Sequence, residues 1–261
     1  LHEAIPNAQI LIVRSATKVT AALLQDAPNL RLIIRAGVGL DNIDIDACKA
    51  KNIEVKNTPN ASTNAVAELA ICMLIGSMRK VGYLHAKMAE GEWAKKEGTG
   101  QEIHGKTLGI IGMGRIGQAV AQKAKALGMN VIYHDREGKN LPDFKFIQSI
   151  DELLSSSDAI SLHAAAPKNA PPILSQKEFS KCKKGAYLLN LARGSLIDES
   201  ALIDALKSGQ IAAAALDVYP SEPYEGELCI LENVLLTPHI GASTLEAQLK
   251  IADEIVQIIK G

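Results

Sequence analysis

Aromatic residues are scarce in this 261-residue chain, where one Trp, five Tyr and three Phe make up 3% of the sequence. So few rings disfavour a protein that stacks nucleic-acid bases or sugars on aromatic platforms. An excess of one charge is also lacking, because 28 Lys and Arg stand against 29 Asp and Glu. A formal net charge of -1 gives no general attraction to nucleic acid or to a membrane surface, so we expect neither partner.

Cysteine is rare as well, and its four copies form no C-x-x-C pair. This spacing indicates neither a zinc site nor a redox dithiol, so we expect no metal. The longest apolar stretch, Ala65 to Ile75, is interrupted by Glu68 and is too short to span a bilayer. No signal peptide opens the chain, and the default expectation is a reducing, cytoplasmic location.

The sequence does contain a regular alternation of short apolar runs and helical patterns, with 47% hydrophobic residues. This alternation predicts an α/β fold with parallel sheets flanked by helices. A long helix is expected from Asn64 to about Glu90, between a small first α/β unit and a larger second one. The second unit is predicted to hold six strands, at residues 107–111, 130–134, 159–163, 185–190, 212–216 and 234–237.

A glycine fingerprint follows the first of these six strands and reads Gly112-Met113-Gly114-Arg115-Ile116-Gly117. Its three glycines allow, in chain order, a tight turn, the close approach of a pyrophosphate and the packing of a helix on the sheet. The N-terminus of that helix also attracts phosphate. Asp135, at the end of the next strand, suits the ribose 2′-hydroxyl of NAD and repels the 2′-phosphate of NADP. We predict NAD as the cofactor.

Three polar side chains that suit hydride transfer follow three later strands, namely Arg193, Glu222 and His239. Parallel strands end at one edge of a sheet, where such folds bind ligands. Arginine can hold a carboxylate with two planar donors, histidine can exchange a proton near neutral pH, and glutamate can orient the histidine. Taken singly, each residue has a purely structural explanation. Arg193 could form a surface ion pair, Glu222 could belong to a turn, and His239 could be a loop histidine. Together they indicate interconversion of a 2-keto acid and a 2-hydroxy acid.

With these motifs the chain resembles the D-isomer-specific 2-hydroxyacid dehydrogenase family. The resemblance spans nearly the whole chain and includes the glycine fingerprint, Asn190–Asp198, Asp217–Pro223, Pro238–Thr244, Ala36–Asp44 and Asn57-Thr58-Pro59. It implies that Arg193 holds the substrate carboxylate and carbonyl. It also implies that His239 is the acid in reduction and the base in oxidation, and that Glu222 pairs with His239.

The resemblance implies further contacts. Backbone N–H groups near Val38 and Gly39 would grip the substrate carboxylate, and Asp217 would bind the nicotinamide carboxamide. Other cofactor contacts would come from Arg115, Ile116, His163, Ala164, Ala192 and Gly241. Relatives carry threonine where this chain has Pro167, so one hydroxyl contact near the cofactor is lost.

The segment Ile12–Val19, and Arg35 just before Ala36, resemble those family members that act on a phosphorylated acid. By that resemblance, Arg14 and Arg35 bind the distal phosphate of 3-phosphohydroxypyruvate, and a dianionic phosphate favours arginine forks. The reaction would be the first committed step of phosphorylated serine biosynthesis. Solvated arginines that cap strand ends are the alternative, with glyoxylate, hydroxypyruvate or lactate as the substrate.

The implied architecture is two Rossmann-like or flavodoxin-like domains with a cleft between them. The substrate-binding domain is discontinuous, at residues 1–66 and 244–261, and lacks the first strand and helix of relatives. The NAD-binding Rossmann domain covers residues 67–243. The long helix and the Gly91–Gly100 arm resemble the family's dimer contact, so we expect a homodimer. Larger relatives carry a regulatory domain for feedback by serine, and if Gly261 is the natural end of this chain we expect no such feedback.

Two other functions fit the same fold. Formate dehydrogenase is disfavoured, because it typically has glutamine where this chain has Glu222. An NAD-sensing corepressor, which binds the cofactor without metabolic turnover, can keep the same catalytic residues. Arg14 and Arg35 favour metabolism over such a role.

Overall fold

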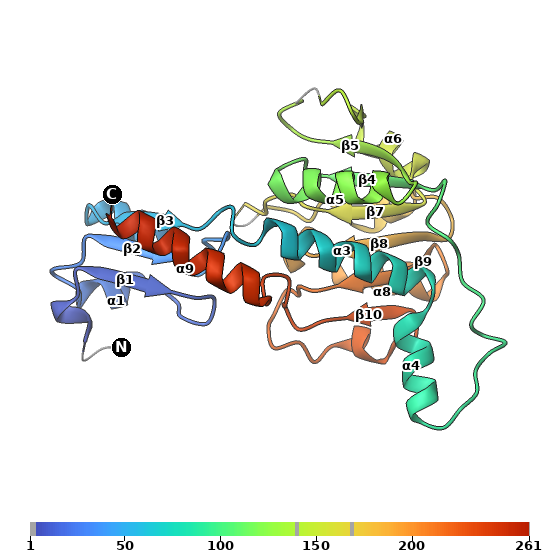
Figure 1. Cartoon of the computed structure of the whole chain (residues 1–261), viewed down its shortest axis with the longest axis horizontal. Helices are drawn as coiled ribbons and strands as arrows, with labels where there is room; N and C mark the ends of the chain where they lie inside the picture. The colour runs from blue at the N-terminus through green and yellow to red at the C-terminus, as the bar shows by residue number, and fades with distance from the viewer. Residues whose placement is uncertain (1–3, 139–140, 168–169, 261) are drawn as a thin grey trace. The chain divides into compact units, whose positions relative to one another are not determined.

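The structure is a computed structural model that describes residues 4–138, 141–167 and 170–260. Leu1 and Gly261, the outer limits of the predicted substrate domain, lie outside these ranges. The chain divides into two compact units, a first unit of residues 1–65 and 242–261 and a second unit of residues 66–241. Each unit has its own parallel sheet flanked by helices (Figure 1), which confirms the predicted α/β class.

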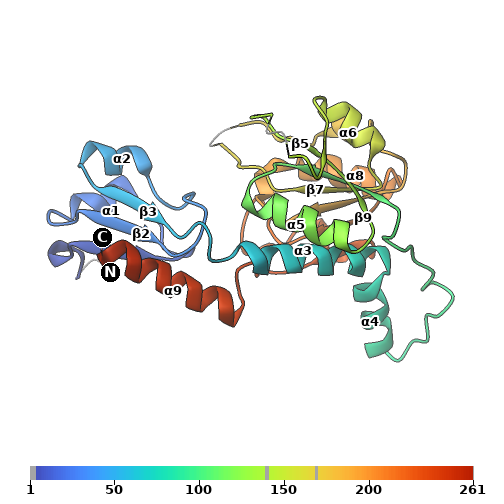
Figure 2. The same cartoon turned by 45° about the horizontal axis from the view of Figure 1, so that its top comes forward.

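The first unit is built on a three-stranded sheet in the order β1 (Ile10–Val13), β2 (Leu32–Arg35), β3 (Glu54–Asn57). Helices α1 (Ala21–Gln25) and α2 (Ile45–Ala50) cover one face, and α9 (Leu245–Lys260) covers the other (Figure 2). Ile33 and Ile34 of the central strand are both fully buried, because they point to opposite covered faces. Val13 pairs with Arg35, so β1 and β2 end at the same edge.

The second unit is built on a seven-stranded parallel sheet. Its order is β10 (Val234–Leu236), β9 (Ile211–Leu216), β8 (Ala186–Asn190), β7 (Ala159–Leu162), β4 (Thr107–Ile111), β5 (Asn130–His134), β6 (Lys145–Phe146). One apolar cluster joins the sheet to α3 (Thr63–Met78) and α5 (Arg115–Ala126), and another joins it to α6 (Ile150–Ser156) and α8 (Glu199–Lys207). All residues of β7 and β8 are buried, which explains why these strands are apolar at nearly every position.

Two of the sequence predictions are wrong. The second unit has seven strands rather than six among the described residues, because Lys145–Phe146 pairs with β5. A two-residue strand is too short to show a periodicity. The predicted helix from Asn64 to Glu90 is two helices, α3 and α4 (Val81–Ala89). Lys80 between them has φ 55° and ψ 32°, a left-handed conformation that ends the hydrogen-bond ladder of α3.

The remaining described helices are short and were not predicted. They are η1 (Ile5–Asn7), α7 (Gln176–Phe179), η2 (Gly194–Leu196) and η3 (Glu227–Ile230). Of these, η2 matters most for function, because it begins directly after Arg193. Within the part of the chain that the structure describes, no helix has the length and apolar character needed to cross a membrane.

Candidate active site

The glycine fingerprint forms the turn between β4 and α5. Gly112 has φ 96°, and a Cβ there would lie 2.6 Å from the backbone nitrogen of Ala164, so only glycine fits. A Cβ on Gly117 would lie 2.2 Å from the carbonyl oxygen of Gly112. Because glycine has no Cβ, α5 can pack closely on this turn. Gly114 is the N-cap of α5, and nothing lies within 4 Å of its Cβ position. The turn therefore leaves open space in front of the free N–H groups of a helix, as a pyrophosphate needs.

A cavity of about 560 Å³ lies beside this turn. Its volume falls within the range of small-molecule and cofactor pockets. Five predicted cofactor residues line it, namely Gly112, Gly114, Asp135, His163 and Ala164. The structure thus brings together residues that follow β4, β5 and β7, and these residues fit a dinucleotide. Pro167, at the position where relatives carry threonine, also lines the cavity.

Besides Gly117, which packs on the glycine turn and is not a lining residue, five other predicted cofactor residues lie elsewhere in the second unit. Arg115 and Ile116 belong to the first turn of α5. Ala192, Asp217 and Gly241 follow the strands β8, β9 and β10. None of these five is among the lining residues of the cavity described above.

Asp135 and His163 are the two predicted cofactor residues in this cavity whose side chains can carry a charge. Asp135 is held at the end of β5, where its Oδ2 accepts from the amide of Met113 at 2.7 Å and its Oδ1 accepts from that of Glu137 at 3.0 Å. The ring of His163 lies 2.8 Å from Ser161 Oγ through Nε2. Burial lowers the pKa of His163 to about 4, so the ring is neutral at physiological pH. The ring of His163 therefore adds no positive charge beside Asp135, whose carboxylate suits a ribose hydroxyl.

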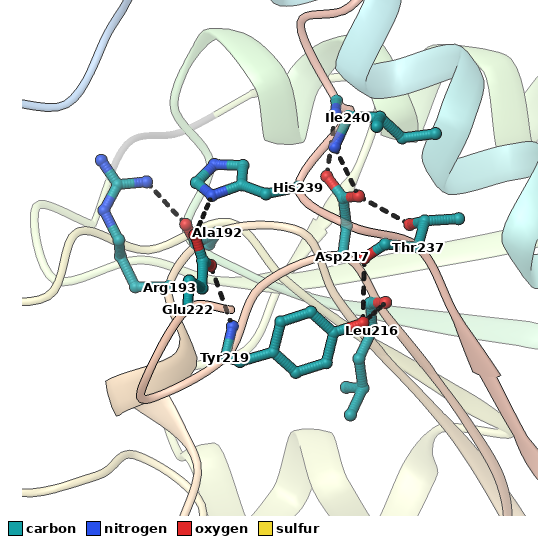
Figure 3. Close-up of polar contacts among 10 residues, drawn as sticks. Ala192, Arg193, Leu216, Asp217, Tyr219, Glu222, Thr237, His239 and Ile240 are labelled. Atoms are coloured by element: carbon teal, nitrogen blue, oxygen red, sulfur yellow. Dashed lines mark hydrogen bonds and ion pairs between the residues drawn. The ribbon is translucent and has the colours of Figure 1, made fainter. Parts of the chain in front are cut away.

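Arg193 follows β8 and is the N-cap of η2. The buried side chain of Asn190 holds this loop, because its Nδ2 donates to the Arg193 carbonyl at 2.8 Å and its Oδ1 accepts from the Ala192 amide at 3.1 Å. The guanidinium Nη1 donates to the Ala192 carbonyl at 2.6 Å (Figure 3). Asn190 is a supporting residue that was not among the predicted site residues. The sequence feature that could have indicated this role is the position of Asn190, a polar residue at the end of an apolar strand.

Glu222 and His239 come from different loops and meet in the structure. His239 Nδ1 lies 2.8 Å from Glu222 Oε2 (Figure 3). With the carboxylate ionised, Nδ1 carries the proton of this bond, so the ring presents Nε2 to other partners. Glu222 Oε1 also accepts from the amide of Tyr219 at 3.2 Å. Both side chains are partly exposed and line a second cavity, of about 550 Å³, together with Tyr219, Pro223 and Pro238.

Tyr219 connects the three loops, although it was not among the predicted site residues. Its hydroxyl oxygen lies 2.9 Å from the carbonyl oxygen of Thr237 and 3.1 Å from that of Leu216, so its single proton is shared between the two. Its backbone lies against Gly194, where a Cβ would come within 2.0 Å of the Tyr219 carbonyl carbon. The loops that carry Arg193, Glu222 and His239 are therefore linked through one residue. An aromatic residue inside a loop motif gives little signal of such a role from sequence alone.

The predicted substrate residues Arg14, Arg35, Val38 and Gly39 lie in the first unit, at the edge where β1 and β2 end. Arg35 Nη1 donates to the Ala36 carbonyl at 2.9 Å and occupies the space beside Gly37, where a Cβ would lie 1.5 Å from it. Gly37 also has φ 138°, so the position favours glycine.

Asn42 supports the loop that carries Arg14, because its Nδ2 donates to the carbonyls of Arg14 and Thr17 at 2.9 and 2.6 Å. Asn57 Nδ2 donates to the Val38 carbonyl at 2.6 Å. Two asparagine side chains therefore hold the loops of the predicted substrate residues at one edge of the first unit's sheet.

Comparison with known proteins identifies the family. The model of the NAD binding domain of D-isomer specific 2-hydroxyacid dehydrogenases matches residues 71–241. The chain is 44% identical over 265 residues to a hydroxypyruvate reductase of Thermotoga maritima, covering 99% of this chain and 86% of that protein. It is 43% identical over 270 residues to a D-3-phosphoglycerate dehydrogenase of Methanocaldococcus jannaschii, covering 100% of this chain and 52% of that protein.

The structural match agrees with these relatives. A glyoxylate reductase from Paecilomyes thermophila superposes with a TM-score of 0.91 at 36% identity, covering 99% of this chain and 83% of that one. The chain spans about half the length of the phosphoglycerate dehydrogenases it matches. The glycine turn, the cavity beside it and the loops at the ends of β8, β9 and β10 all lie within the matched range or at its end. The chain therefore belongs to the D-isomer-specific 2-hydroxyacid dehydrogenase family and carries that family's NAD-binding domain.

Proposed function

We propose that this protein interconverts D-3-phosphoglycerate and 3-phosphohydroxypyruvate with NAD, as a D-3-phosphoglycerate dehydrogenase at the first committed step of phosphorylated serine biosynthesis. The observation that carries the reaction type is the 2.8 Å contact between His239 Nδ1 and Glu222 Oε2 at the end of the NAD-binding domain's sheet. In this proposal the second unit binds the cofactor and supplies the catalytic residues, and the first unit supplies the further substrate contacts Arg14, Arg35, Val38 and Gly39.

Three side chains of the second unit have separate roles in the proposed reaction. Arg193 binds the carboxylate and carbonyl of the 2-keto acid through its planar guanidinium. His239 donates the proton on Nε2 to the carbonyl oxygen during reduction and takes it back during oxidation. Glu222 accepts from Nδ1, which orients the ring so that Nε2 faces the substrate. The nicotinamide, when bound, supplies or accepts the hydride at the substrate C2.

The cofactor preference rests on Asp135. Its carboxylate is fixed at the end of β5 and lines the cavity beside the glycine turn. Because a carboxylate accepts from a ribose hydroxyl and repels a 2′-phosphate, it favours NAD over NADP. Arg136 lines the same cavity and could contact a phosphate, so a direct comparison of NADH with NADPH tests this assignment.

The phosphorylated substrate is supported by Arg14 and Arg35, which follow or end neighbouring strands of the first unit. We expect Arg14→Ala to raise the KM for 3-phosphohydroxypyruvate by about tenfold or more, the loss of one charge-assisted contact. The KM for unphosphorylated hydroxypyruvate should change little. Arg31→Ala is the matched control, because Arg31 is exposed and immediately precedes β2, at the opposite end of that strand. Equal losses for both acids would show that Arg14 does not bind the phosphate.

A hydroxypyruvate or glyoxylate reductase is the second candidate. It is favoured by the 44% identity to a hydroxypyruvate reductase, of which the match covers 86%. Initial rates of NADH oxidation with 3-phosphohydroxypyruvate, hydroxypyruvate, glyoxylate and pyruvate separate the two candidates. We expect the highest kcat/KM for the phosphorylated acid. A higher value for hydroxypyruvate or glyoxylate would replace the proposed substrate and leave the reaction type unchanged.

We also propose a homodimer, assembled through α4 and the arm that follows it. Three large apolar side chains are exposed there, with Trp93 77%, Val81 55% and Met88 53% accessible. Exposed large apolar side chains on neighbouring segments, here Val81 and Met88 on α4 and Trp93 just after it, are typical of a protein–protein contact. Sedimentation equilibrium should give a dimer for the wild type and a weaker dimer for Trp93→Ser. A monomeric wild type would contradict this part of the proposal.

A cytoplasmic location is supported by the four cysteines. All are free thiols, with Cys48 and Cys182 buried and Cys72 and Cys229 exposed. Unpaired thiols suit a reducing compartment. Burial raises the pKa of Cys182 to about 12, so this thiol is unreactive.

A further inference from the structure

Asp217, directly after β9, is a buried carboxylate whose two oxygens are occupied within the protein. Its Oδ1 accepts from Thr237 Oγ1 at 2.6 Å and from the Ile240 amide at 2.8 Å. Its Oδ2 accepts from the Gly241 amide at 2.9 Å. All three donors belong to residues 237–241, the segment that carries His239 (Figure 3).

His239 itself has a left-handed backbone, with φ 53°. This conformation is unfavourable for a non-glycine residue, so it persists only where the surroundings hold it. The donors to Asp217 stand on both sides of His239, one before it and two after it. The carboxylate therefore holds the two ends of the strained residue and fixes the direction in which the imidazole leaves the backbone.

Gly241 allows this approach. A Cβ at Gly241 would lie 3.2 Å from Asp217 Oδ2 and 3.2 Å from a methyl carbon of Val66, so a larger residue would press on both neighbours. The Tyr219 hydroxyl adds a fourth contact from the same side, to the Thr237 carbonyl at 2.9 Å. The segment is thus anchored to the loop after β9, the loop that also carries Glu222.

We propose that Asp217 is a positioning residue, which clamps residues 237–241 so that the imidazole of His239 meets Glu222. This inference rests on the proposed function, in which the His239–Glu222 pair transfers the proton. The family resemblance implies a contact between Asp217 and the nicotinamide carboxamide. A carboxylate has about four acceptor positions, and three are already used within the protein, so the clamp is the larger part of its role.

A double-mutant cycle tests the clamp. We expect Asp217→Ala to lower kcat by about 10²-fold or more, as a misplaced general acid does, and to change the dissociation constant of NADH by less than about threefold. If Asp217 acts through the His239–Glu222 contact, Glu222→Gln should cost much less in the Asp217→Ala background than in the wild type. The proposal would be overturned if Glu222→Gln lowered kcat by the same factor in the Asp217→Ala background as in the wild type. It would also be overturned if Asp217→Ala greatly weakened NADH binding and left kcat unchanged.

The placement of the ring can be read without turnover. Long-range ¹H–¹⁵N correlation spectra should show neutral His239 with its proton on Nδ1 in the wild type and mainly on Nε2 in Asp217→Ala. Asp198→Ala is the matched control, because Asp198 also accepts backbone and hydroxyl bonds in the second unit, at the start of α8. Its spectrum should keep the wild-type signal of His239.

Thr237→Val serves if Asp217→Ala does not fold, because it removes the 2.6 Å bond to Oδ1 and a weaker 3.7 Å contact with Met73 Sδ, and it keeps both backbone bonds to Asp217. It should shift the His239 signal in the same direction by a smaller amount. An unchanged signal in both variants would refute the clamp even if the enzyme is active. A wild type without activity on any 2-keto acid would refute the proposed function, and the spectra would still test the clamp.

Discussion

Gly194→Ala probes how closely the loop of Arg193 packs against the loop of Glu222. The added Cβ would lie 2.0 Å from the carbonyl carbon of Tyr219, 2.3 Å from its oxygen and 2.4 Å from the nitrogen of Pro220. All three are backbone atoms, so no flexible side chain can move aside. To reach the 3.4 Å of ordinary contact, the two loops must separate by roughly 1.4 Å.

That separation should affect activity more than stability. A displacement of about 1 Å in a positioning group costs on the order of 10²-fold in rate, so we expect kcat/KM for the 2-keto acid to fall by about that factor. Overpacking of this kind costs about 1–3 kcal/mol, and each kcal/mol lowers Tm by about 2–4 °C in a domain of this size. Steady-state rates and calorimetry on the same preparations measure both quantities.

Gly209→Ala is the matched control. Gly209 has φ 71° and nothing within 4 Å of its Cβ position, so the substitution strains the backbone without a clash. It should lower Tm by a few degrees, as a left-handed alanine costs about 1–2 kcal/mol, and leave kcat/KM unchanged. Wild-type kcat/KM in Gly194→Ala would refute the argument that this contact positions Arg193 relative to Glu222.

Three further predictions concern the cofactor cavity. Because burial lowers the pKa of His163 to about 4, stability should fall as pH drops from about 6.5 to 4, by at most about 3 kcal/mol, and His163→Gln should flatten this slope in urea titrations. Asp135→Ser should raise the KM for NADH by about tenfold and lower that for NADPH, and an unchanged ratio would contradict the role of Asp135. Gly117→Ala, whose Cβ would lie 2.2 Å from the Gly112 oxygen, should weaken NADH binding in fluorescence titrations.

The sheet of the second unit could be predicted from sequence because its central strands are buried on both faces. β7 and β8 are apolar at nearly every position, a local pattern that requires no knowledge of distant contacts. β6 was missed because its two residues, Lys145 and Phe146, are too few to form a sequence pattern, and the packing of Phe146 on Tyr133 of β5 is a tertiary contact. The break between α3 and α4 was missed for a related reason. Lys80 is not a helix breaker by type, and its left-handed backbone is accompanied by a bond from its Nζ to the carbonyl of Glu97, which no local pattern indicates.

In the candidate site, too, some residues could be predicted from their type and others depend on tertiary contacts. Residue types that suit hydride transfer pointed to Arg193, Glu222 and His239, and the structure brings the last two within 2.8 Å. The supporting contacts were not predictable in this way. Tyr219 joins three loops through one hydroxyl, one amide and a backbone contact, and such roles depend on tertiary packing rather than on residue type.

His239→Ala in single-turnover reduction of a 2-keto acid by NADH tests the central claim most directly, because this step excludes product release. We expect the rate of the chemical step to fall by about 10²–10⁴-fold, the usual contribution of a general acid, while the affinity for NADH stays at the wild-type value. A variant that reduces the substrate at the wild-type rate would contradict the account.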